Sequence, residues 1–326
     1  MLRGEMTYAR TCDRTYQLRR RERLTPAASL PSGGRRPFCY DMLLRLGIHT
    51  SVAGSLENSA LKAAELGANT FQIFSSSPRM WRASVPERDG IKRLRAARER
   101  FDLHPLAIHA NYLINLASID PVIRGKSIEG FRGELERAQA IGAEYVVLHP
   151  GSYQGRTVEE GMASLVSGLR ESTTGMRRNP VMVLLENTAG AGCQIGSRFE
   201  ELRAIRDMAA NEASLEIGYC LDTCHLYAAG FNIARMAGLH AMLSQAEETL
   251  GLAHVRLIHA NDSKGGLGSK LDRHAHIGAG KIGRAGFRRI LTDRRLRQKP
   301  FILETPVDEP GDDRRNLDML KSLALG

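Results

Sequence analysis

The sequence has 326 residues but no long apolar run. No stretch approaches the 18 or so consecutive apolar residues of a membrane-spanning helix, so we expect neither a membrane span nor a membrane partner. The hydrophobic content of 42% and the charged content of 25% are typical of a soluble globular protein. The length is large for one ordinary domain but normal for an α/β barrel, which takes roughly 200 to 400 residues.

Cysteine is scarce, and its spacing follows no known pairing pattern. No CxxC pair and no zinc-finger spacing occurs among the five cysteines, which are Cys12, Cys39, Cys193, Cys220 and Cys224. An odd number without such spacing argues against a disulfide framework and against a zinc site closed by thiolates. We therefore expect reduced thiols in a cytoplasmic protein.

The sequence also lacks the glycine-rich phosphate turn of dinucleotide-binding sheets. The first predicted strand, 44–49, runs into TSVAG at 50–54, which holds a single glycine. The stretch most similar to such a turn, GAG at 190–192, follows the fifth predicted strand and lacks the third glycine. A doubly wound sheet is therefore the weaker of two α/β alternatives.

The first 42 residues have no apolar periodicity. They hold nine arginines against four carboxylates, which accounts for half of the net charge of +10. They also lack the apolar core of a secretion signal. A disordered basic arm, a targeting peptide and translated upstream sequence before a start at Met42 stay open, and we favour the first and the last. We expect a basic, disordered extension over 1–42 and one barrel domain over 43–326.

From residue 43 onward, short apolar runs alternate with amphipathic stretches. The runs are continuously apolar, which is typical of parallel strands buried on both faces. We predict eight strands, at 44–49, 69–74, 105–110, 144–149, 181–186, 215–222, 254–260 and 300–304. Helices are predicted at 55–66, 87–101, 129–141, 158–171, 198–210, 234–250, 284–293 and 312–324. Eight such units predict a single (β/α)8 TIM barrel, with its chemistry at the C-terminal ends of the strands.

Metal-ligating side chains recur at those strand ends and in the loops that follow. The set is His109, His149, Glu186, Asp222, His225, His259, Asp272, His274 and Glu304. Each alone has an ordinary structural explanation; Asp222, for example, could simply cap the next helix. Together they would leave many buried charges unpaired unless metal ions bound them.

The composition of this set indicates the kind of metal centre. Imidazoles and carboxylates without cysteine favour zinc, with manganese as the alternative at some sites. Nine donors suit three ions better than one, and Glu186 could bridge two of them. Cys220 and Cys224 alternate with the ligands along the chain, so we expect both to face the surrounding core. Closely spaced metal ions suit in-line attack on a phosphodiester.

Three motifs in this chain resemble those of the endonuclease IV family. Members of this family are zinc-dependent apurinic/apyrimidinic endonucleases of base excision repair. The motifs are HANYLINLA at 109–117, GYCLDTCH at 218–225, and IHANDSK at 258–264 followed by DRH at 272–274. Shorter matches support them: LHPGS at 148–152, ENTAG at 186–190 and LET at 303–305. The resemblance covers about residues 45–310.

The resemblance implies three zinc ions, held by three sets of residues. The sets are His109, His149 and Glu186; Glu186, Asp222, His259 and Glu304; and His225, Asp272 and His274. It further implies cleavage 5′ to abasic sites in duplex DNA, leaving a 3′-hydroxyl and a 5′-deoxyribose phosphate. Substrates with blocked 3′ ends are a further expectation, and we expect a monomer that acts on the chromosome.

The resemblance also points to residues that would hold a kinked duplex. Arg79 and Tyr112, with Leu113 beside Tyr112, match side chains that the family inserts into DNA. Lys264 and Arg273 are basic residues of loops near the expected mouth and fit phosphate contacts. Without the resemblance, a solvated loop charge is the simpler explanation of Arg79, and an aromatic packed under a loop that of Tyr112. Ala110 and Asn111 depart from the more polar pair of some family members.

Two alternatives compete with this interpretation. A sugar isomerase or epimerase of the same barrel would use one metal, held by a set such as Glu186, Asp222, His259 and Glu304. The other five ligands would then have no use. A DNA-binding protein with purely structural metals is the second alternative, and the open, cysteine-free ligand set argues against it.

Overall fold

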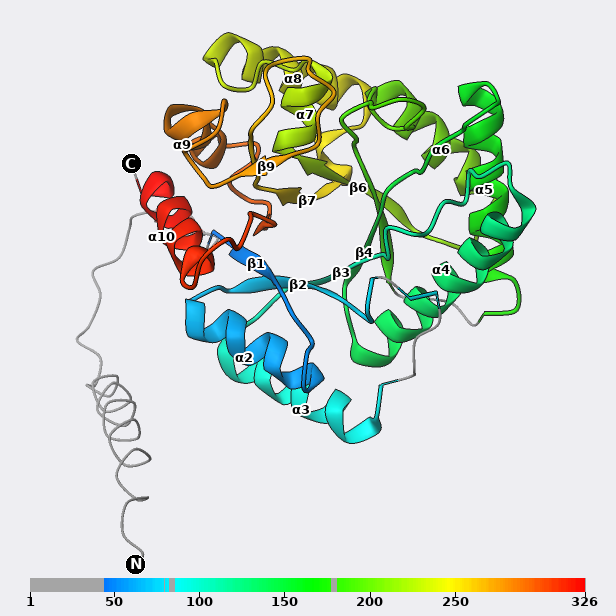
Figure 1. Cartoon of the computed structure of the whole chain (residues 1–326), viewed down its shortest axis with the longest axis horizontal. Helices are drawn as coiled ribbons and strands as arrows, with labels where there is room; N and C mark the ends of the chain where they lie inside the picture. The colour runs from blue at the N-terminus through cyan, green and yellow to red at the C-terminus, as the bar shows by residue number, and fades with distance from the viewer. Residues whose placement is uncertain (1–43, 79, 82–85, 177–180, 326) are drawn as a thin grey trace, which may run out of the picture. The chain divides into compact units, whose positions relative to one another are not determined.

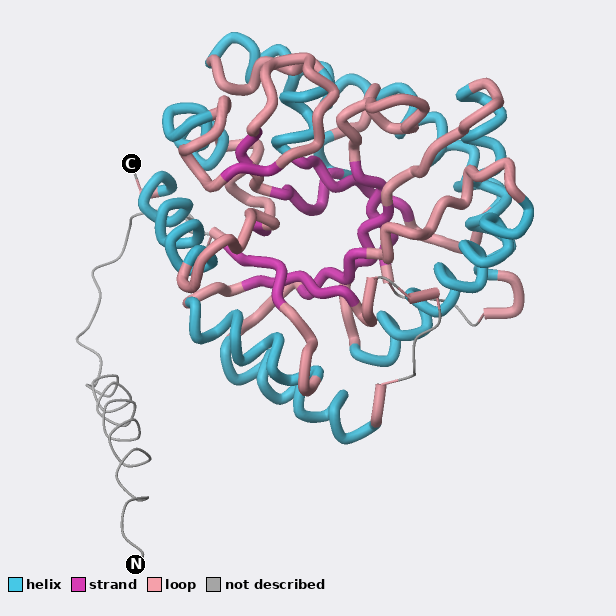
Figure 2. Tube along the Cα trace, viewed as in Figure 1, coloured by secondary structure: helices cyan, strands magenta, loops and turns pink. Residues whose placement is uncertain are grey.

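The computed structural model describes residues 44–78, 80–81, 86–176 and 181–325. Eight parallel strands close into a barrel in the order β1-β10-β7-β6-β5-β4-β3-β2, which confirms the predicted architecture. Figure 1 shows the helices arranged around these strands, and Figure 2 shows the strands as a ring. The extension predicted over residues 1–42 lies outside the described residues.

The barrel strands match the predicted apolar runs, trimmed by a residue or two at most ends. They are β1 (Leu46–Thr50), β2 (Thr70–Phe74), β3 (Leu106–His109), β4 (Tyr145–Leu148), β5 (Met182–Glu186), β6 (Ile217–Asp222), β7 (Val255–His259) and β10 (Phe301–Leu303). Each pairs in parallel with both neighbours, as the crossover helices require.

The outer helices also follow the prediction. They are α2 (Leu56–Leu66), α3 (Arg88–Phe101), α4 (Pro121–Ile141), α5 (Val158–Thr173), α6 (Phe199–Glu212), α8 (Met236–Thr249), α9 (Gly283–Thr292) and α10 (Asp312–Ala324). The predicted start of α4 at residue 129 is wrong by two turns. Asp120 caps the helix by accepting hydrogen bonds from the backbone N–H groups of Val122 and Ile123, and Pro121 occupies the first turn.

Three short elements were not predicted, because each is too short to show a periodicity. They are α7 (Thr223–Ala229), a 3-10 turn (Leu252–His254), and the antiparallel hairpin of β8 (Asp262–Ser263) and β9 (His274–Ala275). Both α7 and the hairpin lie on the side of the barrel where the strands end. They carry predicted ligands that no barrel strand supplies.

Two apolar layers hold the strands in place. A large core fills the space between strands and helices, with Phe71, Phe131 and Tyr219 among its fully buried side chains. A smaller cluster fills the inside of the barrel, made of Ala107, Val147, Leu184, Cys220, Leu257 and Ile302. The barrel is therefore a packed core rather than a pore, which leaves only the strand ends for chemistry. No helix among the described residues has the length and apolar character needed to cross a bilayer.

Candidate metal centre

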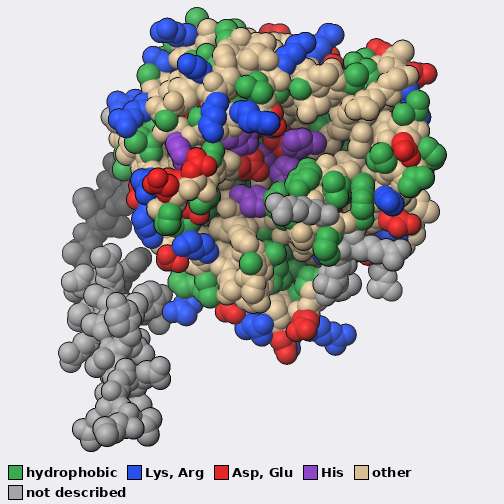
Figure 3. All heavy atoms as spheres, in the orientation of Figure 1, with side chains coloured by type: hydrophobic (Ala, Val, Ile, Leu, Met, Phe, Trp, Pro, Cys, Tyr) green, Lys and Arg blue, Asp and Glu red, His purple; other side chains and the backbone are tan. Residues whose placement is uncertain are grey.

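All nine predicted ligands surround the mouth formed by the C-terminal ends of the strands. Figure 3 shows histidines and acids gathered in a hollow of this face. Four ligands are the last residues of a strand and two follow a strand directly: His109, Glu186, Asp222 and His259, then His149 and Glu304. The other three come from α7 and the β8–β9 hairpin: His225, Asp272 and His274.

Glu186 lies at the centre of the cluster and is completely buried. Its Oε2 lies 3.3 Å from His109 Nε2 and 3.1 Å from His149 Nε2. Its Oε1 lies 3.0 Å from His259 Nδ1 and 3.3 Å from His225 Nδ1. One carboxylate thus reaches imidazoles on two sides, which is the placement that a bridging ligand needs.

Asp222 has two structural roles at the end of β6. Its Oδ1 accepts a hydrogen bond of 2.7 Å from the backbone N–H of His225, and so caps α7. Its Oδ2 accepts a hydrogen bond of 2.5 Å from the Asn261 amide and lies 3.8 Å from His274 Nε2. The helix cap is therefore confirmed, and it leaves Oδ2 on the side of His274 as a candidate metal donor.

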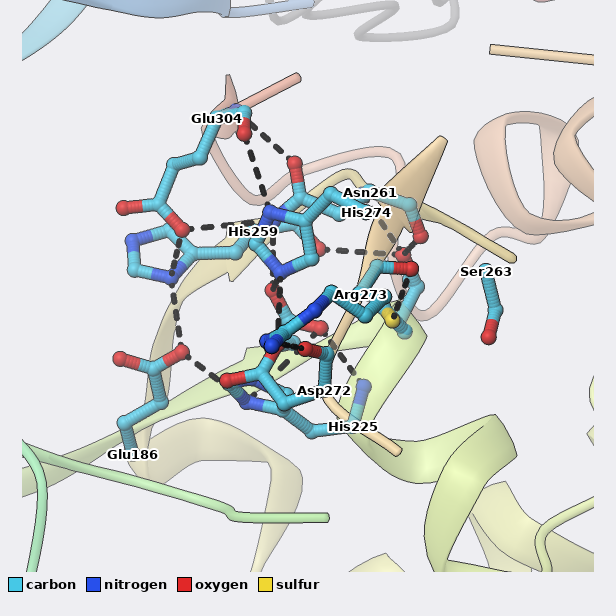
Figure 4. Close-up of polar contacts among 12 residues, drawn as sticks. Glu186, His225, His259, Asn261, Ser263, Asp272, Arg273, His274 and Glu304 are labelled. Carbon is cyan, nitrogen blue, oxygen red and sulfur yellow. Dashed lines mark hydrogen bonds and ion pairs between the residues drawn. The ribbon is translucent and has the colours of Figure 1, made fainter. Parts of the chain in front are cut away.

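The hairpin contributes the outermost part of the cluster. Asp272 Oδ2 lies 3.1 Å from His225 Nε2, and Asp272 Oδ1 lies 3.4 Å from His274 Nε2. His274 Nδ1 donates a 2.9 Å hydrogen bond to the Glu304 carbonyl, which leaves Nε2 for the site. That buried Nε2 has no hydrogen-bond partner among the described residues. Figure 4 shows Asp272, His225 and His274 directed toward one another.

The charges of this cluster compensate one another in pairs. Burial opposes ionisation of Glu186, but the charges of His259 and His149 hold its pKa well below its usual range. Burial likewise opposes protonation of His225, whereas Asp222 and Asp272 raise its pKa well above its usual value. For His274, burial is outweighed by Asp272 and Asp222, which raise its pKa to about 9. The carboxylates thus stay ionised, and their negative charge favours a positive charge, whether a proton or a metal ion, between the donors.

Four groups of donors lie close enough to share an ion. The donor atoms fall within 4.8 Å of one another in the groups His109, His149 and Glu186; Asp222, His225 and His274; Cys224, Asp272 and His274; and Glu186, Asp222, His259 and Glu304. Two of these equal sets that the resemblance implies. The third implied set is divided between the two overlapping groups that share His274.

Two cysteines lie beside the predicted ligands. Cys220 belongs to the cluster inside the barrel, as predicted, and burial raises the pKa of its thiol to about 12. The prediction that Cys224 faces the surrounding core is wrong: its buried sulfur donates to the Arg273 carbonyl at 3.7 Å and lies within 4.8 Å of donor atoms of Asp272 and His274. Burial raises its pKa to about 12 as well. The predicted donor set consists of imidazoles and carboxylates, and the sulfur of Cys224 lies beside its Asp272 and His274 members.

Several supporting polar residues were not predicted. Asn187 accepts from the backbone N–H of Asp222 at 2.7 Å, and its own carbonyl lies 2.9 Å from His225 Nδ1. Asn261 joins Asp222 to the backbone N–H of Glu304, where its Oδ1 accepts at 2.8 Å. Asn187 follows a ligand by one residue and Asn261 follows one by two, so their positions offered a signal. Gln72 of β2 is also fully buried at the mouth, and the polar residue inside the apolar run Thr70–Phe74 was its only signal.

The residues predicted to contact DNA lie at the rim, with one exception. The Tyr112 side chain is 59% exposed, and Leu113 beside it is half-buried. Lys264 and Arg273 are exposed on the hairpin, where the Lys264 N–H donates to the Arg273 carbonyl at 2.9 Å. Arg79 lies outside the described residues.

The Tyr112 loop is held by a ring contact with β2 and by hydrogen bonds of Asn111. The Tyr112 ring packs edge-on against Phe74 at 6.5 Å, and Phe74 in turn packs against His109 at 5.6 Å. The Asn111 amide donates to the Met80 carbonyl at 2.9 Å and accepts from the Leu113 N–H at 2.9 Å. An exposed ring is thus held at a fixed place relative to the proposed ligand His109.

Known proteins resemble the chain in sequence and in fold. The sequence model of the xylose isomerase-like TIM barrel family matches residues 60–323. A protein of Solibacter usitatus named probable endonuclease 4 is 67% identical over 281 residues, which are 86% of this chain and 97% of that protein. The crystal structure of endonuclease IV from Thermus thermophilus has a TM-score of 0.75 at 40% identity, covering 86% of this chain and 98% of that one. A D-tagatose 3-epimerase-like protein, with a TM-score of 0.62 at 21% identity, shares the fold and covers 86% of this chain and 96% of that one.

Proposed function

This chain belongs to the endonuclease IV family within the xylose isomerase-like TIM barrels, and we propose that it repairs DNA by hydrolysing the phosphodiester bond 5′ to abasic sites. The products are a 3′-hydroxyl and a 5′-deoxyribose phosphate. The substrates are double-stranded DNA with abasic sites or with blocked 3′ ends. The observation that carries the proposal is that all nine predicted ligands fall into overlapping donor groups at one mouth, two of which share Glu186.

The nine residues fit a centre of three zinc ions, with manganese possible at some sites. His109, His149 and Glu186 would hold one ion, and Glu186, Asp222, His259 and Glu304 a second. The third would be held by His225, Asp272 and His274. The Nε2 of His274 supports this: it makes no hydrogen bond among the described residues and faces two carboxylates, Asp272 at 3.4 Å and Asp222 at 3.8 Å, as a shared ion would require. Divalent ions at such groups lower the pKa of water and neutralise charge on phosphate oxygens.

Glu186 is the residue that we expect catalysis to depend on most. Its two oxygens face different imidazoles, so its carboxylate would join two ion positions without moving. The imidazole of His109 is itself oriented, because its Nδ1 lies 2.8 Å from the Ala110 carbonyl. Its Nε2 is thereby directed toward Glu186. The chain thus fixes its donors before substrate binds, which lowers the reorganisation cost of the reaction.

The rim supplies contacts to the duplex. Lys264 and Arg273 would bind backbone phosphates, which makes affinity fall as salt increases. Tyr112, with Leu113 beside it, would fill the space left when the abasic nucleotide leaves the stack; Arg79 is proposed for the same role from the resemblance alone. Extrusion costs a few kcal/mol and is least costly where a base is already missing. We place this activity on the chromosome in the cytoplasm, carried out by a monomer.

A single-metal sugar isomerase or epimerase is the competing function. It would need only Glu186, Asp222, His259 and Glu304 of the nine ligands. The remaining five ligands belong to the same contact network, with His225 and His149 both within 3.3 Å of Glu186. This favours the multinuclear centre and phosphodiester chemistry.

The decisive experiment uses zinc-loaded protein and a duplex with one abasic site in a labelled strand. We expect one cut 5′ to the site and a new 3′ end that a DNA polymerase can extend. Asp318→Ala, an exposed position on α10, serves as the matched control for Glu186→Gln. Intact duplex after treatment with loaded wild-type protein would refute the proposed activity, and a cut on the 3′ side would refute its stated chemistry.

A further inference from the structure

Gln72 is a fully buried amide that no ligand set includes. It lies in β2, paired across the sheet with His49 of β1, and its side chain enters the mouth beside His259 and Glu304. Its Nε2 donates a 2.6 Å hydrogen bond to Glu304 Oε1 and lies 3.1 Å from His49 Nδ1. Its Oε1 lies 2.9 Å from His259 Nε2. The amide therefore contacts two proposed ligands at once.

These contacts fix the orientation of the amide. The side-chain NH2 group can only donate, and an ionised carboxylate can only accept. The end that faces Glu304 must therefore be the NH2 group, and the oxygen must face His259. A flipped amide would place two acceptors 2.6 Å apart, which is repulsive.

The orientation of Gln72 in turn fixes the tautomer of His259. Because an amide oxygen accepts, His259 Nε2 must carry a hydrogen. A neutral imidazole carries only one, so Nδ1 keeps its lone pair. Nδ1 is the atom that lies 3.0 Å from Glu186 Oε1 and 3.3 Å from Glu304 Oε2, within the donor group Glu186, Asp222, His259 and Glu304.

From this geometry we infer that Gln72 is a positioning residue that presents His259 Nδ1 and the Glu304 carboxylate to the ion shared by the Glu186, Asp222, His259 and Glu304 group. The inference rests on the metal centre proposed above. Hydrogen-bonded partners of metal ligands fix ring orientation and raise ligand basicity, and their loss commonly weakens metal affinity about 10- to 100-fold. Gln72 makes no step of the reaction itself.

Gln72→Met tests the inference, since methionine has a similar volume but cannot replace either hydrogen bond. Zinc would be counted by elemental analysis, and the affinity of each ion measured by competition with a chromogenic chelator. We expect one ion per chain to bind about 10- to 100-fold more weakly while the other two are unchanged. Gln72→Glu keeps an acceptor for His259 Nε2 but replaces the donor to Glu304 by a second carboxylate, so it should weaken the same ion and leave the other two unchanged. Gln245→Met on α8, whose amide contacts Glu200 at 3.3 Å, is the control for the chemical change.

Nitrogen NMR of the imidazoles supplies a second measurement. In loaded wild-type protein, His259 should carry its hydrogen on Nε2. Wild-type affinity for every ion in Gln72→Met would overturn the inference, and so would an equal loss of all ions in Gln72→Met and Gln72→Glu. A wild-type protein that binds no zinc would instead overturn the metal centre on which the inference rests.

Discussion

Replacing Asp262 by alanine should destabilise the protein more than any change at an exposed acid. Asp262 is completely buried in β8 and accepts hydrogen bonds from five backbone N–H groups. The donors are Ser263 at 2.8 Å, Gly278 at 2.9 Å, Gly280 at 3.0 Å, Ile282 at 2.9 Å and Gly283 at 3.2 Å. One carboxylate thus ties the β8–β9 hairpin to the segment that leads into α9.

The magnitude follows from which donors water can reach. The hydrogen bonds from Ser263 and Ile282 are buried, whereas those from the three glycines are partly exposed. A buried donor left without a partner costs about 1–3 kcal/mol, so two of them with smaller losses at the glycines give roughly 3–5 kcal/mol. At about 2–4 °C per kcal/mol for a domain of this size, Tm should fall by roughly 10 °C.

Thermal unfolding of Asp262→Ala and of Asp318→Ala measures this difference. Asp318 is exposed on α10, so its replacement should change the free energy of unfolding by no more than about 0.5 kcal/mol. Because the hairpin carries Asp272 and His274, Asp262→Ala should also lose zinc to a chelator sooner and be cut faster by trypsin at Lys264 or Lys270. If the two variants melted within about 2 °C of each other, the assigned role of the buried carboxylate would be wrong.

Three further predictions concern the metal centre and the rim. Glu186→Gln should stay folded but lose orders of magnitude in abasic-site cleavage, because a neutral amide is a poor bridge between cations; near-normal cleavage would contradict the bridging role. Tyr112→Ala should keep its zinc and lose much more cleavage of abasic duplex than of a small phosphodiester that needs no bending, whereas equal losses would show that the ring supports the metal site. In metal-stripped protein, the pKa of His274 is raised to about 9 from an unfolded value near 6.5. Its stabilisation is therefore complete below a pH of about 6.5 and is lost as pH rises through about 9. Tm of the stripped wild-type protein should therefore fall as pH rises over this range, and Tm of stripped His274→Asn should fall less. An identical dependence of Tm on pH in the two proteins would refute the assignment.

The sequence alone determined the barrel and placed most of the proposed ligands at its mouth. Continuous apolar runs at regular spacing specify parallel strands buried on both faces, because only such strands tolerate apolar residues on both sides. Histidines and carboxylates at the ends of those runs then had to meet at one mouth, since parallel strands end on the same side. His149 and Glu304 could be placed there without any coordinates for this reason.

The tertiary structure was needed for two kinds of feature. These are contacts that depend on the direction of a side chain, and elements too short to show a periodic pattern in the sequence. The start of α4 was missed because a cap at Asp120 carries no periodicity. α7 has seven residues and the hairpin strands have two each, so the approach of Asp272 to His225 was visible only in the folded chain. Gln72 is a single polar residue in an apolar strand, and only closure of the barrel brings it against His259, 187 positions away. Contacts of that range come from the packing of the whole barrel, which no local sequence pattern encodes.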